Sequence, residues 1–99
     1  TAETVPVITV NSPTENQTVD IEQPVVITAT AQPYPGRAIR KYEFLLNGQL
    51  IGSKESEIID YQFIPADYIS IPGLVELEII AIDSVYSRSS QKIPINIVQ

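Results

Sequence analysis

The chain has 99 residues, 12 of them acidic and 6 basic, which gives a net charge of −6 and an isoelectric point near 4.3. An acidic domain repels phosphate, and this argues against binding to nucleic acid or simple adsorption to anionic lipid. Cysteine and histidine are both absent, which removes thiol catalysis, disulfides, histidine general bases and the usual zinc and copper ligands.

The hydrophobic content of 43% fits one folded domain over residues 1–99. No apolar run approaches the roughly 20 residues that span a bilayer, so we do not expect a membrane-spanning chain. The first strand is predicted at residues 4–10. It is followed by Pro13, which cannot donate a ladder hydrogen bond. A short edge segment is predicted at 17–21 and a full strand at 23–32, and a Pro-Gly-rich loop follows.

A β-hairpin is the clearest local signal in the chain. Asn47-Gly48 tolerates the positive φ angles of a type I′ turn, and alternating residues flank it at 39–46 and 49–53. A two-residue turn fixes the register of the strands that it joins. The expected pairs are Leu46 with Gln49, Leu45 with Leu50, and Phe44 with Ile51.

The second half of the chain continues the same pattern. Strands are predicted at 57–64, 74–83 and 91–98, and residues 65–73 form the longest connection. No apolar stripe at helical spacing persists for three turns, and prolines and β-branched residues are spread throughout, so helix content should be very low.

About seven short strands at this spacing predict an all-β, immunoglobulin-like Greek-key sandwich, with a closed barrel as the alternative. The residues of the buried faces form the expected core: Val25, Ile27, Ala29, Tyr42, Phe44, Leu46, Val75, Leu77, Ile79, Ile93 and Ile95.

Several segments together resemble a known family. They are Val-Ile-Thr-Val-Asn-Ser-Pro at 7–13, the alternating strand at 26–31, Ile-Arg-Lys-Tyr-Glu-Phe at 39–44, the Asn-Gly turn, and the strand that ends at Asp83. In this order and spacing, over roughly residues 5 to 98, the chain is similar to bacterial immunoglobulin-like domains. Such domains occur as repeats in secreted and cell-surface proteins, many of them attached to polysaccharide-degrading enzymes.

The chain departs from the family pattern in two loops. Pro35-Gly36-Arg37 stands where the family usually has an Asp-Gly turn, and Ser84-Val85-Tyr86 where it often has a glycine. The resemblance implies an extracytoplasmic bacterial module without cofactor or catalytic activity. Such a module acts as a spacer or presentation domain between neighbouring domains of the same polypeptide. The alternative is a carbohydrate-binding module.

Three loop tyrosines, Tyr34, Tyr68 and Tyr86, are the candidate ligand-binding residues because exposed aromatic rings stack on sugars. Tyrosines also close the ends of sandwiches, with the hydroxyl bonded to backbone, and we favour that interpretation.

Asp83, which ends a strand, could bind Ca²⁺ together with carboxylates in or near turns at Glu15, Asp20 or Asp60. We favour a simpler role, in which Asp83 accepts hydrogen bonds from the backbone of its own turn.

A group of aliphatic residues is expected on the outer face of the sheet, where it could contact a neighbouring domain: Ile39, Leu45, Leu50, Ile80 and Ile82. Scattered exposed aliphatic side chains are also normal on a protein surface. Glu76 and Glu78 share that face roughly 7 Å apart, but we interpret them as a solvated strand face and not as a glycosidase pair.

Overall fold

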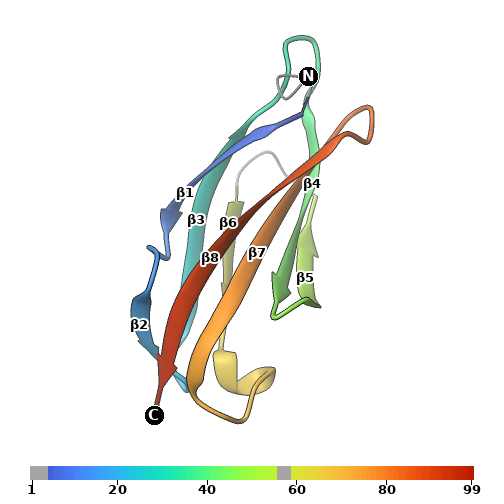
Figure 1. Cartoon of the computed structure of the whole chain (residues 1–99). Helices are drawn as coiled ribbons and strands as arrows, with labels where there is room; N and C mark the ends of the chain where they lie inside the picture. The colour runs from blue at the N-terminus through green and yellow to red at the C-terminus, as the bar shows by residue number, and fades with distance from the viewer. Residues whose placement is uncertain (1–4, 56–58) are drawn as a thin grey trace.

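The computed structural model describes residues 5–55 and 59–99, and within them the chain forms eight strands and one short 3₁₀ helix (Figure 1). The elements are β1 (Val7–Ser12), β2 (Gln17–Asp20), β3 (Val25–Gln32), β4 (Ile39–Leu46), β5 (Gln49–Lys54), β6 (Ile59–Phe63), η2 (Pro65–Asp67), β7 (Gly73–Asp83) and β8 (Arg88–Val98). No helix in this described part of the chain has the length and apolar character needed to cross a membrane.

The strands form two sheets that pack face to face. The smaller sheet has the order β1-β3-β6, and the larger has the order β2-β8-β7-β4-β5. β1 belongs to the smaller sheet, whereas β2 lies parallel to β8 in the larger sheet. The chain therefore changes sheets between β1 and β2. This is an immunoglobulin-like Greek-key sandwich, as predicted. The barrel alternative is wrong, because the two sheets remain separate.

The core lies between the sheets, where period-two alternation directs apolar side chains. The residues expected there are all buried: Val25, Ile27, Ala29, Tyr42, Phe44, Leu46, Val75, Leu77, Ile79, Ile93 and Ile95. Strand boundaries differ from prediction by a few residues, mainly at β1, which spans Val7–Ser12 and not residues 4–10, and at β8, which begins at Arg88 and not at residue 91. Residues 4, 57 and 58 of the predicted strands lie outside the described residues.

The hairpin contains a bulge that the turn did not reveal. Asn47 and Gly48 have φ angles of 51° and 83°, which confirms the predicted turn. Phe44, however, pairs with Gly52, so the predicted pairing with Ile51 is wrong. A glycine at this place agrees with the local packing: the Tyr61 ring stacks on Phe44 with ring centres 4.4 Å apart, and a Cβ on residue 52 would overlap the Tyr61 ring.

A second bulge at Arg40 changes which side chains face the core. Ile39 pairs with Asp83 and Lys41 pairs with Ile82, which leaves Arg40 as the extra residue of β4. The extra residue reverses the alternation at the start of the strand. Ile39 is therefore buried in the core at 7% exposure, and its predicted place on the outer surface is wrong.

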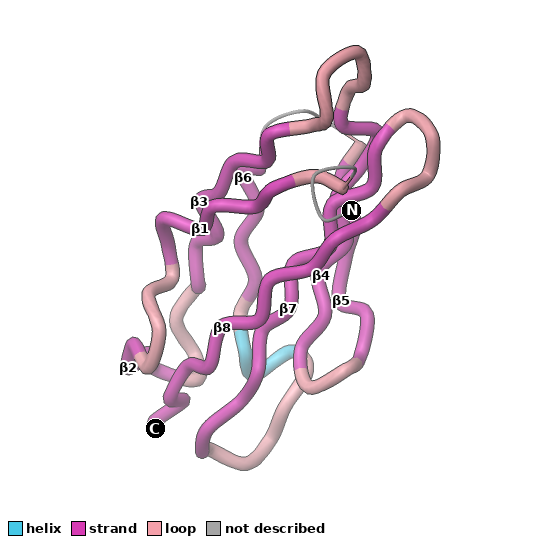
Figure 2. Tube along the Cα trace, turned by 45° about the horizontal axis from the view of Figure 1, so that its top comes forward, coloured by secondary structure: helices cyan, strands magenta, loops and turns pink. Residues whose placement is uncertain are grey.

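The body is elongated, measuring 45 × 21 × 20 Å along its principal axes. The chain enters β1 near one end of the long axis and leaves β8 at the other (Figures 1 and 2). We call the first the upper end, formed by the loops at 33–38 and 84–87. The lower end is formed by the loops at 21–24, 47–48 and 64–72.

Candidate functional site

Asp83 connects the two loops of the upper end through hydrogen bonds and an ion pair. Its carboxylate is fully buried, and Oδ1 accepts hydrogen bonds from the backbone N–H groups of Val85 at 3.0 Å and Ser87 at 2.9 Å. Oδ2 lies 3.3 Å from Nη1 of Arg37 in the other loop. The Ser84 N–H also donates a backbone hydrogen bond of 2.9 Å to the Ala38 carbonyl, which joins the two loops.

These bonds agree with the turn interpretation of Asp83, because both of its oxygens are already engaged. Asp20 accepts a hydrogen bond from the Glu22 N–H at 2.8 Å in the lower end, and the Asp60 side chain lies outside the described part of the structure. No group of three or more acidic side chains within the described residues is arranged to hold a metal ion. The calcium hypothesis, which included Glu15, therefore gains no support from these side chains.

The three loop tyrosines do not form one platform. Tyr34 and Tyr86 belong to the upper end, where guanidinium groups lie 4.9 Å from the ring centres: Arg37 over Tyr34 and Arg40 over Tyr86. Tyr68 follows η2 in the lower end and is half-buried.

Tyr68 closes the lower end of the sandwich. Its ring packs edge-on against Phe63 at 6.3 Å, and its hydroxyl donates a hydrogen bond of 3.4 Å to the Ile51 carbonyl. Packing and this hydrogen bond give Tyr68 the role of a lid, which agrees with the favoured interpretation, and the alternative of a sugar-stacking ring gains no support at this residue.

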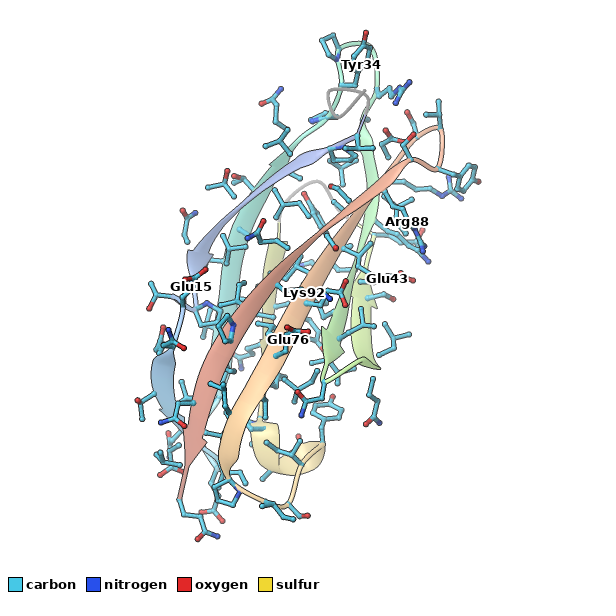
Figure 3. All side chains as sticks on the ribbon, in the orientation of Figure 1. Glu15, Tyr34, Glu43, Glu76, Arg88 and Lys92 are labelled. Carbon is cyan, nitrogen blue, oxygen red and sulfur yellow. The ribbon has the colours of Figure 1, made fainter. Side chains whose placement is uncertain are left out.

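A groove opens beside Tyr86 on the outer face of the larger sheet. We call it the cationic groove; it has a volume of about 390 Å³ and is lined by Arg40, Lys41, Ile82, Tyr86 and Arg88. Lys41, Ile82 and Arg88 form one cross-strand row over β4, β7 and β8. Figure 3 shows Arg88 above Glu43 at this part of the molecule.

Ile82 forms the floor of the cationic groove. It faces away from the core, as predicted, yet it is only 5% exposed. The long side chains that line the groove cover it, because the aliphatic parts of lysine and arginine pack on apolar surface. Its predicted availability as a surface contact is therefore wrong.

Basic residues are concentrated at the upper end of an acidic chain. Four of the six lie here, namely Arg37, Arg40, Lys41 and Arg88. Arg37 is paired with Asp83, and Glu43 is shared between Lys41 at 3.5 Å and Arg88 at 3.7 Å. Among the described residues no carboxylate pairs with Arg40. Sequence reasoning missed this cluster, although three of the cations lie within residues 37–41.

Tyr86 holds an unusual backbone conformation. Its φ angle is 65°, in the left-handed region that glycine enters freely and that costs other residues roughly 1–2 kcal/mol. The side chain is 67% exposed, so burial does not explain why a tyrosine stands there.

The remaining aliphatic candidates are divided between the outer face and the hairpin edge. Leu45 and Ile80 are half-buried and Leu50 is exposed, and their role in a domain contact stays a prediction. The lower end exposes larger aliphatic surface than they do, at Ile71 (78%) and Leu74 (67%). Sequence reasoning missed these two residues because one lies in a connection and the other begins a strand.

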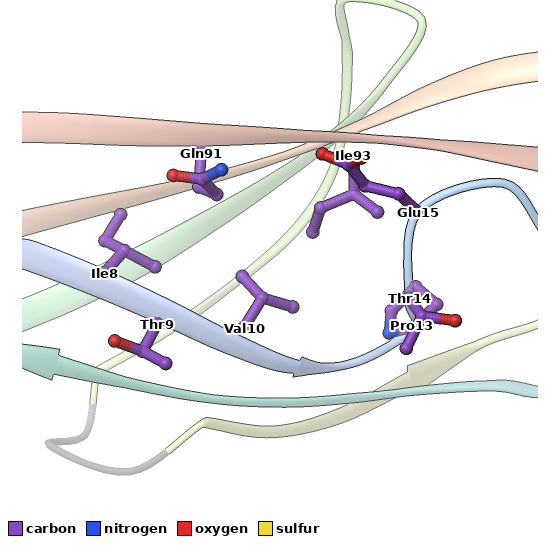
Figure 4. A pocket seen from close by; sticks show the side chains of 8 residues that line it. All are labelled: Ile8, Thr9, Val10, Pro13, Thr14, Glu15, Gln91 and Ile93. Atoms are coloured by element: carbon purple, nitrogen blue, oxygen red, sulfur yellow. The ribbon is translucent and has the colours of Figure 1, made fainter.

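A second groove, of about 330 Å³, follows the seam between β1 and β8 (Figure 4). Ile8, Val10 and Ile93 line its apolar part, and Glu15 is the carboxylate at its rim. The seam opens because β2 pairs only with the last residues of β8. Glu76 and Glu78 line neither groove, and Glu76 lies 3.8 Å from Lys92, as expected of a solvated face.

Comparison with known proteins agrees with this architecture. A profile of the bacterial Ig domain matches residues 6–86. None of the curated proteins searched matches the chain.

Among solved structures, the fibronectin(III)-like modules of CbhA from Clostridium thermocellum superpose with a TM-score of 0.79 and 23% identity. The match covers 97% of this chain and 48% of that one, so the chain spans about half the length of that relative. Superoxide reductase (neelaredoxin) from Ignicoccus hospitalis gives a TM-score of 0.67 and 14% identity, with 95% of this chain and 80% of that one covered. At these identities the likeness establishes the fold alone.

Proposed function

The chain belongs to the bacterial Ig domain family, and we propose that its 99 residues form one non-catalytic module that holds neighbouring domains of an extracytoplasmic bacterial polypeptide apart. The observation that carries this proposal is the placement of the chain's entry and exit at opposite ends of a body 45 Å long. Domains joined at these two points stand on opposite sides of the sandwich.

The close-packed core supports the spacer role because it makes the module rigid along its long axis. Residues on facing strands of both sheets, such as Ile27, Phe44, Leu77 and Ile95, are fully buried. Close packing of this kind resists deformation, so distance between the ends is fixed by the sandwich itself. Only the connections on either side remain free to bend.

The lower end offers a surface for the domain that follows. Ile71 and Leu74 are exposed there. Leu74 pairs with Asn96, close to the point where β8 ends at Val98. Apolar surface beside a chain exit is suited to pack against the next domain. We propose these two residues as the contact, in addition to Leu45, Leu50 and Ile80.

Small-angle X-ray scattering of the polypeptide that carries the module tests the proposal. Deleting residues 5–98 should shorten the maximum dimension by about 45 Å and leave the activities of the other domains unchanged. Ile71→Ser with Leu74→Ser should keep that dimension but broaden the distance distribution, and Val7→Ser on β1 is the matched exposed control. An unchanged dimension after deletion, or loss of a catalytic activity with it, would refute the spacer role.

A further inference from the structure

We propose that the cationic groove binds a carboxylate-bearing sugar ring, the uronic acid unit of an acidic glycan. The groove is a feature of the upper end and does not depend on the spacer role. Its walls supply positive charge through Arg40, Lys41 and Arg88 and an exposed aromatic ring through Tyr86.

The basic side chains of the groove can bind a carboxylate in addition to that of Glu43. Lys41 and Arg88 share one partner, Glu43, at 3.5 and 3.7 Å, which is longer than the roughly 2.7–2.9 Å of a tight charge-assisted hydrogen bond. Arg40 has no carboxylate partner among the described residues. An anion can therefore approach Arg40 and Arg88 without displacing a close ion pair.

The spacing suits a single ring. Lys41 and Arg88 flank Ile82 on adjacent strands, and two strand spacings place their Cα atoms roughly 10 Å apart. The volume of about 390 Å³ falls within the range of about 300–1,000 Å³ that is usual for small-molecule sites.

Tyr86 supplies the surface that a sugar needs beyond charge. Arg40 lies over its ring, 4.9 Å from the centre, and the side chain as a whole remains 67% exposed. The open part of the ring can stack on the apolar face of a pyranose. The ring stands at a left-handed backbone position that glycine enters freely, and this agrees with a function for the ring.

An acidic peptide fits the groove less well than a sugar. Peptides commonly add as a strand to an open sheet edge. β7, which carries the floor of the groove, is instead paired with β4 on one side and with β8 on the other, so a peptide cannot add to it as a strand. Recognition must come from side chains alone, which here are cations and one aromatic ring.

Titration of the 99-residue chain followed by amide chemical shifts tests the proposal. Trigalacturonic acid should shift resonances of Lys41, Tyr86 and Arg88, and the binding should weaken as salt is raised. Maltotriose is the neutral control, sodium sulfate reports an adventitious anion, and a hexaglutamate peptide reports the peptide alternative. Absence of these shifts, or equal affinity for any of the three other ligands, would overturn the assignment.

Variants separate the groove from general charge effects. Arg88→Ala and Tyr86→Asn should each weaken trigalacturonate binding about tenfold, and asparagine tolerates the left-handed backbone so that the loss reports the ring. Glu43→Gln should strengthen binding severalfold by removing the competing carboxylate. Lys92→Ala, on the same strand but paired with Glu76, is the control that should leave affinity unchanged. If Lys92→Ala weakens binding as much as Arg88→Ala, attraction is nonspecific and the site is refuted.

Discussion

The two ends of the sandwich share one core but are closed by different chemistry. At the upper end a buried carboxylate, Asp83, ties two loops together through backbone N–H groups and Arg37. The lower end is closed by aromatic side chains: the hydroxyls of Tyr61 and Tyr68 both donate to the Ile51 carbonyl, at 3.1 and 3.4 Å.

The difference determines what each end can bind. The loops of the upper end are held by charged and polar groups, and further basic side chains lie beside Tyr86 in the cationic groove. An end closed by rings leaves aliphatic residues outside, such as Ile71 and Leu74. Polar closure therefore suits recognition of a charged ligand, and apolar closure suits packing against another domain.

Removing the carboxylate at the upper end should have the largest effect on stability. Asp83→Ala removes the acceptor of two backbone N–H groups in a part-buried turn, those of Val85 and Ser87, together with the carboxylate that pairs with Arg37. Each such group costs about 1–3 kcal/mol, so we expect a loss of about 3 kcal/mol in the free energy of unfolding, measured in urea.

Arg37→Ala is the matched variant on the other side of the ion pair. Its side chain is partly exposed, so we expect a smaller loss of about 1 kcal/mol. If Arg37→Ala costs as much as Asp83→Ala, the ion pair holds the upper end and the turn hydrogen bonds do not.

The sequence predicted the parts of the fold that follow strict alternation. The Asn47-Gly48 turn and the buried faces of β3 and β7 could be identified because their periodicity continues without interruption. The bulges at Arg40 and Ile51 could not, since a bulge depends on what packs from the other sheet or strand. The error at Ile39 followed directly from the first of them.

The candidate site was less predictable because it depends on neighbours brought together by folding. Tyr68 and Tyr86 look alike in the sequence, yet one packs against Phe63 and the other stands exposed beside Arg40. Arg88 reaches the groove from β8, more than 40 residues after Lys41, and only the strand register places them in one row.

A smaller loss in the free energy of unfolding is expected from a substitution at Gly52 on β5. Gly52→Ala adds a Cβ that overlaps the Tyr61 ring, which is held by its stack on Phe44. We expect a loss of about 1–2 kcal/mol by urea denaturation, since the ring must leave its place. A double variant with Tyr61→Leu should cost less than the sum of the single changes. Strict additivity would show that the glycine and the ring do not constrain each other.

The smallest effect is an alkaline loss of stability that originates in Tyr61. Burial, followed by the charge and hydrogen bond of the neighbouring Tyr68, raises the pKa of Tyr61 above its ordinary value of 10.0. The folded state therefore keeps its proton at a pH where the unfolded chain has begun to lose it. Above about pH 10 the folded state binds more protons, so the free energy of unfolding falls as pH rises through the raised pKa.

Urea denaturation between pH 8 and 11 tests the origin of this fall. Tyr61→Phe should flatten the profile because the group that titrates differently in the two states is gone, although it also removes the bond to the Ile51 carbonyl. Tyr34→Phe, at the upper end, leaves Tyr61 in place and should keep the alkaline fall. The slope of the profile is the readout, since loss of a hydrogen bond lowers stability at every pH, whereas linkage acts only where the proton is released. Equal slopes in wild type and Tyr61→Phe would show that the lower end is not the source of the alkaline sensitivity.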